Sequence, residues 1–237
     1  MSVLGLGLTG GGLALGGHYI NRDALTRTSP QKDSAVHKEA ALINALDSYV
    51  RRVSPDNPIT DLNIDYPTAD EIEAARKPRG NLREVASSGR KDGIPGVKIN
   101  PNAPAPLLAH DLGHTAFGQT KVGNAVQSAR AELSSNPKMR AALIAAGSLS
   151  PFIASALTPG DDDLLPAVGL SLALESPAII DEFEANRRSL SLMKDAGVPM
   201  RMGDRARMAG SFLSYLGKPL ALAASGNIAG NMLDSDV

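Results

Sequence analysis

A shortage of large side chains is the feature that most constrains how this chain can fold. Only 3% of its 237 residues are aromatic, and there is no Trp. A buried core must therefore be made of Ala, Leu, Ile, Val and Met, and small side chains of this kind suit closely packed helices. The chain is long enough for one domain with a real core, with or without an appendage. We predict a mainly α-helical fold.

The charge and the missing cysteines exclude several classes of function. Because the chain has no Cys, it can form neither disulfides nor a thiolate zinc site, and His and carboxylates are the remaining zinc ligands. The formal net charge of -1 offers no electrostatic attraction for polyanions, so no nucleic-acid partner is expected.

Apolar residues are concentrated in three stretches without Asp, Glu, Lys or Arg. These are Met1 to Asn21, Ala141 to Gly160 and Pro219 to Leu233. Each approaches the roughly 20 residues of a membrane-spanning helix, and their Gly, Ala and Ser content permits close helix contacts. We expect membrane association, with membrane lipids as partners, and a homo- or hetero-oligomer is compatible with such surfaces. The start of the chain lacks the basic residues of a secretory signal peptide, so none is expected.

The pattern divides the chain into three parts: a Gly-rich apolar segment (1–22), a polar region of unknown role (23–92) and a helical domain (93–237). Periodicity and turn residues predict helices from about Val36 to Val53 and from about Ala69 to Arg76, and one short strand within Gly93 to Asn100.

The sequence His110-Asp111-Leu112-Gly113-His114 contains two of the four histidines in the chain. On a helix, which Pro106 suits as a first-turn residue, residues four apart lie on the same face. Two imidazoles so placed, with an acid between them, can provide two ligands to zinc.

A second helix is predicted with Ser176 as N-cap and Gly197 at its C-terminal stop. Its expected buried stripe contains Ile179, Phe183, Asn186, Leu190 and Met193, and its expected solvated face contains Glu184, Arg187, Arg188, Ser191, Lys194 and Asp195. Glu182 lies beside the apolar stripe and is predicted to point inward, whereas Glu184 points to water. An inward carboxylate needs a cation, a metal or a proton.

These motifs resemble a known family. LLAHDLGHTAFGQ is similar to the AHExGHxxQ segment of the bacterial membrane-bound neutral zinc metallopeptidases, and SPAIIDEFEANRRSLSLMKDAG is similar to their later helix. VKIN and ARMAGSFLSYLGKPLALAAS also resemble family segments, and together the likeness covers about residues 93 to 229.

The resemblance implies a zincin-like helical scaffold that binds zinc and acts on a peptide substrate. It implies that His110, His114 and Glu182 ligate the zinc and that Asp111 is the general base. It also implies that Asn186 contacts the ligands without binding the zinc itself. It also implies that the apolar stretch between the two motifs is embedded in a membrane.

Asp111 departs from the family, which has Glu at this position. The loss of one methylene withdraws the carboxylate by up to about 1.5 Å, and a misplacement of about 1 Å can cost on the order of 10²-fold in rate. We therefore predict a metal-competent site with weak or absent proteolysis.

Two other interpretations stay open. AHDLGHTAFG also resembles the central segment of HD-type metal-dependent phosphohydrolases, which would make Asp111 a metal ligand, with His37 upstream and Asp181 downstream. Alternatively, the chain is a non-enzymatic membrane-active or assembly protein, such as a virion component, built on a degraded peptidase scaffold.

Overall fold

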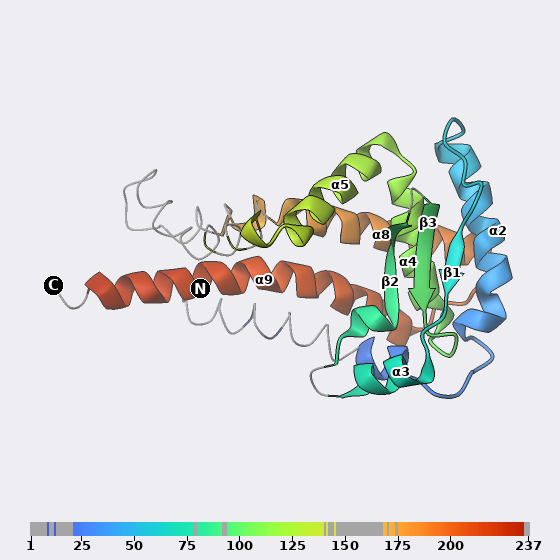
Figure 1. Cartoon of the computed structure of the whole chain (residues 1–237), viewed down its shortest axis with the longest axis horizontal. Helices are drawn as coiled ribbons and strands as arrows, with labels where there is room; N and C mark the ends of the chain where they lie inside the picture. The colour runs from blue at the N-terminus through green and yellow to red at the C-terminus, as the bar shows by residue number, and fades with distance from the viewer. Residues whose placement is uncertain are drawn as a thin grey trace. The chain divides into compact units, whose positions relative to one another are not determined.

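A computed structural model describes residues 21–77, 80–91, 94–139 and 175–234, together with residues 9, 12, 141, 145, 168, 169 and 171–173. The described part is mainly helical and contains a small three-stranded sheet (Figure 1). The chain separates into two compact units by its internal contacts. Unit 1 comprises Met1–Gly17, Val126–Ile180 and Ser211–Val237, and unit 2 comprises His18–Ala125 and Asp181–Gly210. The boundary predicted at residue 92 falls within unit 2.

Two helices form the centre of unit 2, α2 (Ala35–Val53) and α4 (Ala105–Gly118). Their first turns are joined by backbone hydrogen bonds, because the Ala35 amide donates to the Ala103 carbonyl at 2.7 Å and the Ala105 amide donates to the Asp33 carbonyl at 2.8 Å. Their last turns are joined by the Ser54 hydroxyl, which donates to the Gln119 carbonyl at 2.9 Å. The two helices therefore run parallel along their length.

The sheet has the strand order β1-β3-β2, with β1 (Asn63–Asp65) parallel and β2 (Ala86–Lys91) antiparallel to the central β3 (Ile94–Ile99). The sequence analysis predicted only β3, so the expectation of a single strand is wrong. β2 reads ASSGRK and β1 has only three residues, so neither shows the apolar alternation that marks a half-buried strand. Pairing with β3 makes them strands.

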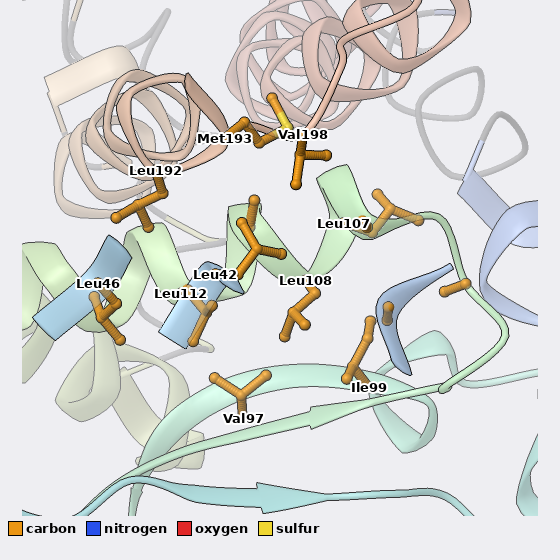
Figure 2. Packing of buried hydrophobic residues seen from close by; sticks show 14 of the residues in the cluster. Leu42, Leu46, Val97, Ile99, Leu107, Leu108, Leu112, Leu192, Met193 and Val198 are labelled. Atoms are coloured by element: carbon orange, nitrogen blue, oxygen red, sulfur yellow. The ribbon is translucent and has the colours of Figure 1, made fainter. Parts of the chain in front are cut away.

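The core of unit 2 lies between the sheet and three helices. Val97 and Ile99 of β3 are buried and face Leu108 and Leu112 of α4, which are also fully buried (Figure 2). The other labelled side chains come from α2, from α4, from α8 and from the segment after α8: Leu42, Leu46, Leu107, Leu192, Met193 and Val198. The cluster is built from Ala, Leu, Ile, Val and Met, as composition predicted.

Helix α8 (Ser176–Asp195) matches the predicted helix in its extent but not in its faces. It ends where Gly197 takes a φ of 63°, with the Val198 amide donating to the Met193 carbonyl at 2.8 Å, as in a Schellman motif. Two residues of the predicted buried stripe are exposed, Phe183 at 51% and Leu190 at 48%. Met193 of the predicted stripe is buried, and the other buried residues of the helix are Asp181, Glu182, Ala185, Arg188, Ser189 and Leu192, four of which are polar.

Further helices are α3 (Ala69–Arg76), α5 (Lys121–Ser135) and α9 (Met202–Asp234), and a 3-10 turn spans Leu82–Glu84. Helix α3 has the predicted bounds and begins with a capping box between Thr68 and Glu71. Within unit 1, Arg130 of α5 donates to the Tyr215 hydroxyl of α9 at 2.7 Å.

The three charge-free stretches have different positions in the structure. The stretch 219–233 forms part of α9, whereas nearly all of 1–21 and 141–160 falls outside the described residues. Among the helices that the structure describes, none has the length and apolarity needed to cross a bilayer.

Candidate metal site

Helices α4 and α8 cross closely enough to bring three ligand side chains together. His110 and His114 occupy successive turns of α4, with ring centroids 4.9 Å apart and planes inclined by 83°. Between them, Gly113 faces α8, and a Cβ at this position would lie 2.3 Å from the Ala185 carbonyl oxygen. Any larger residue would therefore push the helices apart, so glycine sets the distance at which Glu182 of α8 reaches the histidines.

The Glu182 carboxylate bridges the two imidazoles. Its Oε1 lies 3.0 Å from His110 Nε2, and its Oε2 lies 3.5 Å from His114 Nε2. Glu182 is 2% exposed, which confirms the prediction that it points inward. Glu184 instead pairs with Arg187 and Arg188.

The outward nitrogen of each ring is held by a second residue of α8. Asn186 Oδ1 lies 3.0 Å from His110 Nδ1, and Asn186 Nδ2 donates to the Met208 carbonyl at 3.3 Å, which fixes the orientation of the amide. Asp181 Oδ1 lies 3.1 Å from His114 Nδ1. Both partners accept, so each Nδ1–H points away from the site and each Nε2 is directed at Glu182.

The buried charges stabilise one another when no metal is bound. Burial by itself would raise the pKa of Glu182, but the charges and hydrogen bonds of His110 and His114 outweigh it and hold the pKa well below its ordinary value. Burial would likewise lower the pKa of His114, but Asp181 and Glu182 outweigh it and raise the pKa to about 9. The site is therefore preset with an ionised carboxylate beside a protonated imidazole.

Asp111 lies on α4 between the two histidines and is 8% exposed. Burial raises the pKa of its carboxyl to about 6, with a further increase from Glu182 and an opposing effect of His110 and His114. A group with this pKa is mostly ionised at pH 7 and takes up a proton easily, which is the property that a general base needs.

Arg188 supplies a buried positive charge behind the site. It is 7% exposed, its guanidinium lies 4.6 Å from the centroid of the Phe117 ring, and it pairs with Glu184. It is also close enough to Asp181 for their charges to interact. Arg188 therefore stabilises Asp181 in its ionised form, which in turn holds His114.

His110, His114 and Glu182 form a buried group that could hold a metal ion. The three candidate ligand atoms all lie within 4.8 Å of one another. Two ligand atoms that bind one tetrahedral zinc at about 2.1 Å are about 3.4 Å apart. The measured nitrogen-to-oxygen separations of 3.0 and 3.5 Å fit that spacing. Two nitrogens and one oxygen are also the donor set of a three-ligand zinc site with an open position.

The structure brings together the residues that the sequence assigned to the zinc site, with Asn186 behind His110 as expected. It also reveals roles that sequence analysis missed. Asp181, considered only as a metal ligand of an HD-type site, contacts the side of His114 that faces away from Glu182. Arg188, assigned to the solvated face, is buried. The sequence feature that could have predicted the role of Asp181 is its position next to Glu182. No sequence feature predicts the burial of Arg188, because a charged side chain indicates exposure.

His37, the upstream ligand of the HD-type interpretation, lies outside this group. Its Nδ1 is 2.8 Å from the Ser34 hydroxyl oxygen and 2.9 Å from the Gln31 carbonyl oxygen, at the start of α2. Among the described residues, the group that could hold a metal contains neither His37 nor Asp111.

No protein-family model, no curated protein and no solved structure matches this chain. The resemblance to the neutral zinc metallopeptidases therefore depends on the motifs and on the site that they form.

Proposed function

We propose that this protein is a zinc-binding, metallopeptidase-like protein whose proteolytic activity is weak or lost because Asp111 stands where the resembled family has Glu. The observation that carries the proposal is the convergence of His110, His114 and Glu182. Zinc bound by these three residues would supply a Lewis acid that polarises a peptide carbonyl.

The residues around the ligands suit such a site. Asp181 and Asn186 fix the two imidazole rings with Nε2 directed inward, and partners of this kind orient metal-binding histidines and make them stronger ligands. Glu182 offsets the positive charge that a metal would bring. Asp111 would accept a proton during attack on a peptide bond.

The length of Asp111 limits that last step. Because α4 fixes its backbone, its carboxylate ends up to about 1.5 Å short of where a Glu carboxylate would end. The short side chain therefore lowers the rate of hydrolysis, whereas metal binding uses other side chains.

Metal analysis tests the site. Purified wild-type protein should contain about one zinc per chain, as three-ligand sites do. His110→Ala and Glu182→Gln should lose it. His37→Ala is the matched control, because this histidine is at the start of α2, and it should keep the zinc. A wild-type protein that takes up no zinc, or a Glu182→Gln variant that binds it as tightly as the wild type, would disprove the proposed ligand set.

Peptide hydrolysis tests the role of Asp111. Asp111→Glu should raise cleavage of a fluorescent casein substrate by at least about tenfold, because it restores the reach of the carboxylate. Asp111→Asn should show none while it keeps its zinc. Circular dichroism verifies that both variants are folded. If zinc-loaded Asp111→Glu stays at background, the protein is not a peptidase, and the non-enzymatic assembly role becomes the better explanation.

Membrane association is part of the same proposal. It is supported by the three charge-free stretches and by the exposure of Met202, which is 87% exposed beside Arg201 and Arg205 at the start of α9. The full chain should float with liposomes that contain anionic lipid. Recovery of all the protein in the lipid-free fraction would contradict it.

A further inference from the structure

The face of the sheet that points away from α4 has a hollow of about 560 Å³. Side chains alternate along a strand, and because Val97 and Ile99 point to the core, Gly96 and Lys98 lie on the opposite face. In the register of the sheet, Gly96 of β3 lies directly opposite Gly89 of β2. Two glycines side by side leave the floor of the hollow as bare backbone.

Neither glycine is needed for the conformation of the sheet. A Cβ on Gly89 would meet no atom within 4 Å, and a Cβ on Gly96 would be 3.6 Å from the Asn63 carbonyl oxygen, an ordinary contact. Among the described glycines, positive φ occurs at Gly197 alone. Glycine inside a strand weakens it and often marks a place where a ligand approaches the backbone closely. A ligand that rests on this floor gives both glycines a role.

The rim of the hollow determines which ligand fits. Asp65 of β1 and Asp61, which lies just before β1, line the hollow. Lys98, which also lines it, has its ammonium 2.7 Å from Glu71 and is therefore neutralised. Within the described part of the chain, no basic group forms an ion pair with Asp61 or Asp65. The hollow thus combines a flat floor with net negative charge.

We propose that this hollow binds the guanidinium group of an arginine side chain presented by a peptide. A guanidinium is planar and weakly hydrated, so it can lie flat on the bare backbone of Gly89 and Gly96. Its donors form charge-assisted hydrogen bonds with the carboxylates of Asp61 and Asp65. None of the residues that line the hollow belongs to the candidate metal site, so the proposal goes beyond the proposed zinc chemistry.

Titration of the ¹⁵N-labelled full chain with three blocked tripeptides tests the proposal. Gly-Arg-Gly should shift the amide signals of Gly89 and Gly96 in a saturable way. The lysine of Gly-Lys-Gly keeps the positive charge but has no planar group. The citrulline of Gly-citrulline-Gly keeps a planar group but has no charge. Each should bind at least about fivefold more weakly, because each loses part of the charge-assisted contact.

Variants locate the site. Gly89→Val and Gly96→Val fill the floor and should abolish the shifts without lowering the melting temperature, because valine suits an exposed strand. Asp65→Asn should weaken binding about tenfold. Gly203→Ala, an open glycine on α9, and His110→Ala should both bind as the wild type does. Equal affinity for all three peptides, shifts that do not saturate, or unchanged binding by Gly96→Val would each overturn the proposal.

Discussion

The contact between Gly113 and Ala185 gives the sharpest prediction. In Gly113→Ala, the new Cβ would lie 2.3 Å from the Ala185 carbonyl oxygen, whereas ordinary contacts begin at 3.4 Å. The two helices must therefore separate by about 1 Å to restore ordinary packing. That movement carries Glu182 away from the histidines, so its oxygen, now 3.0 Å from His110 Nε2, would be about 1 Å further away.

The same substitution should have a smaller effect on folding than on metal binding. Overpacking costs about 1–3 kcal/mol, and the higher helix propensity of Ala offsets about 1 kcal/mol of that. The free energy of unfolding should therefore fall by at most about 2 kcal/mol. Zinc affinity should fall on the order of 10²-fold, the upper range seen when ligands lose their supporting contacts.

Competition with a chelating dye measures the zinc affinity, and urea unfolding of the metal-free protein measures stability. Gly203→Ala is the matched control, because it is the same change on a helix and its Cβ would meet only Arg207 Nη1, at 3.8 Å. It should leave zinc affinity unchanged. If Gly113→Ala binds zinc as tightly as the wild type, close approach of α4 and α8 does not set the site, and the reasoning is refuted.

Three further predictions concern the partners of the ligands, the proton balance and the core. Asp181→Asn should weaken zinc binding about 10–100-fold without removing a ligand, which equilibrium dialysis would show; an unchanged affinity would mean that Asp181 does not orient His114. Zinc affinity should rise about tenfold per pH unit between pH 6 and pH 8, because a His114 with a pKa of about 9 must release its proton to bind metal, whereas a flat profile would exclude His114 as a ligand. Leu108→Ala, at a fully buried position, should lower the free energy of unfolding by about 2–5 kcal/mol in urea titrations, while the exposed Val122→Ala should change it by less than about 0.5 kcal/mol.

Local patterns predicted several parts of the structure. The capping and stop residues placed α8 within about a residue of its observed bounds, because helix ends are set by interactions a few residues apart. Periodicity and turn residues placed α3 at its observed bounds. The spacing of His110 and His114 placed both rings on one face for the same local reason. Composition alone predicted a core without large aromatic side chains.

The strands β1 and β2 and the buried face of α8 could not be predicted from the sequence. β1 and β2 are polar segments that become strands by pairing with β3, and neither has the run of apolar and β-branched side chains that would mark a strand in its own sequence. Phe183 is exposed and Arg188 is buried, the reverse of what was expected, because the buried side of α8 carries the polar residues of the candidate metal site. An apolar stripe is a poor guide to the buried face where a helix contributes to a polar site.

The sequence by itself determined which residue types are available as candidate ligands, the helical spacing of the two histidines and the inward direction of Glu182, because these depend on residue chemistry and on the period of one helix. Only the tertiary structure decided that Glu182 meets both imidazoles, that Asp181 holds His114 and that Arg188 is buried behind them. Those contacts depend on how closely α4 and α8 approach at Gly113. Packing between distant segments fixes that distance, and no local pattern encodes it.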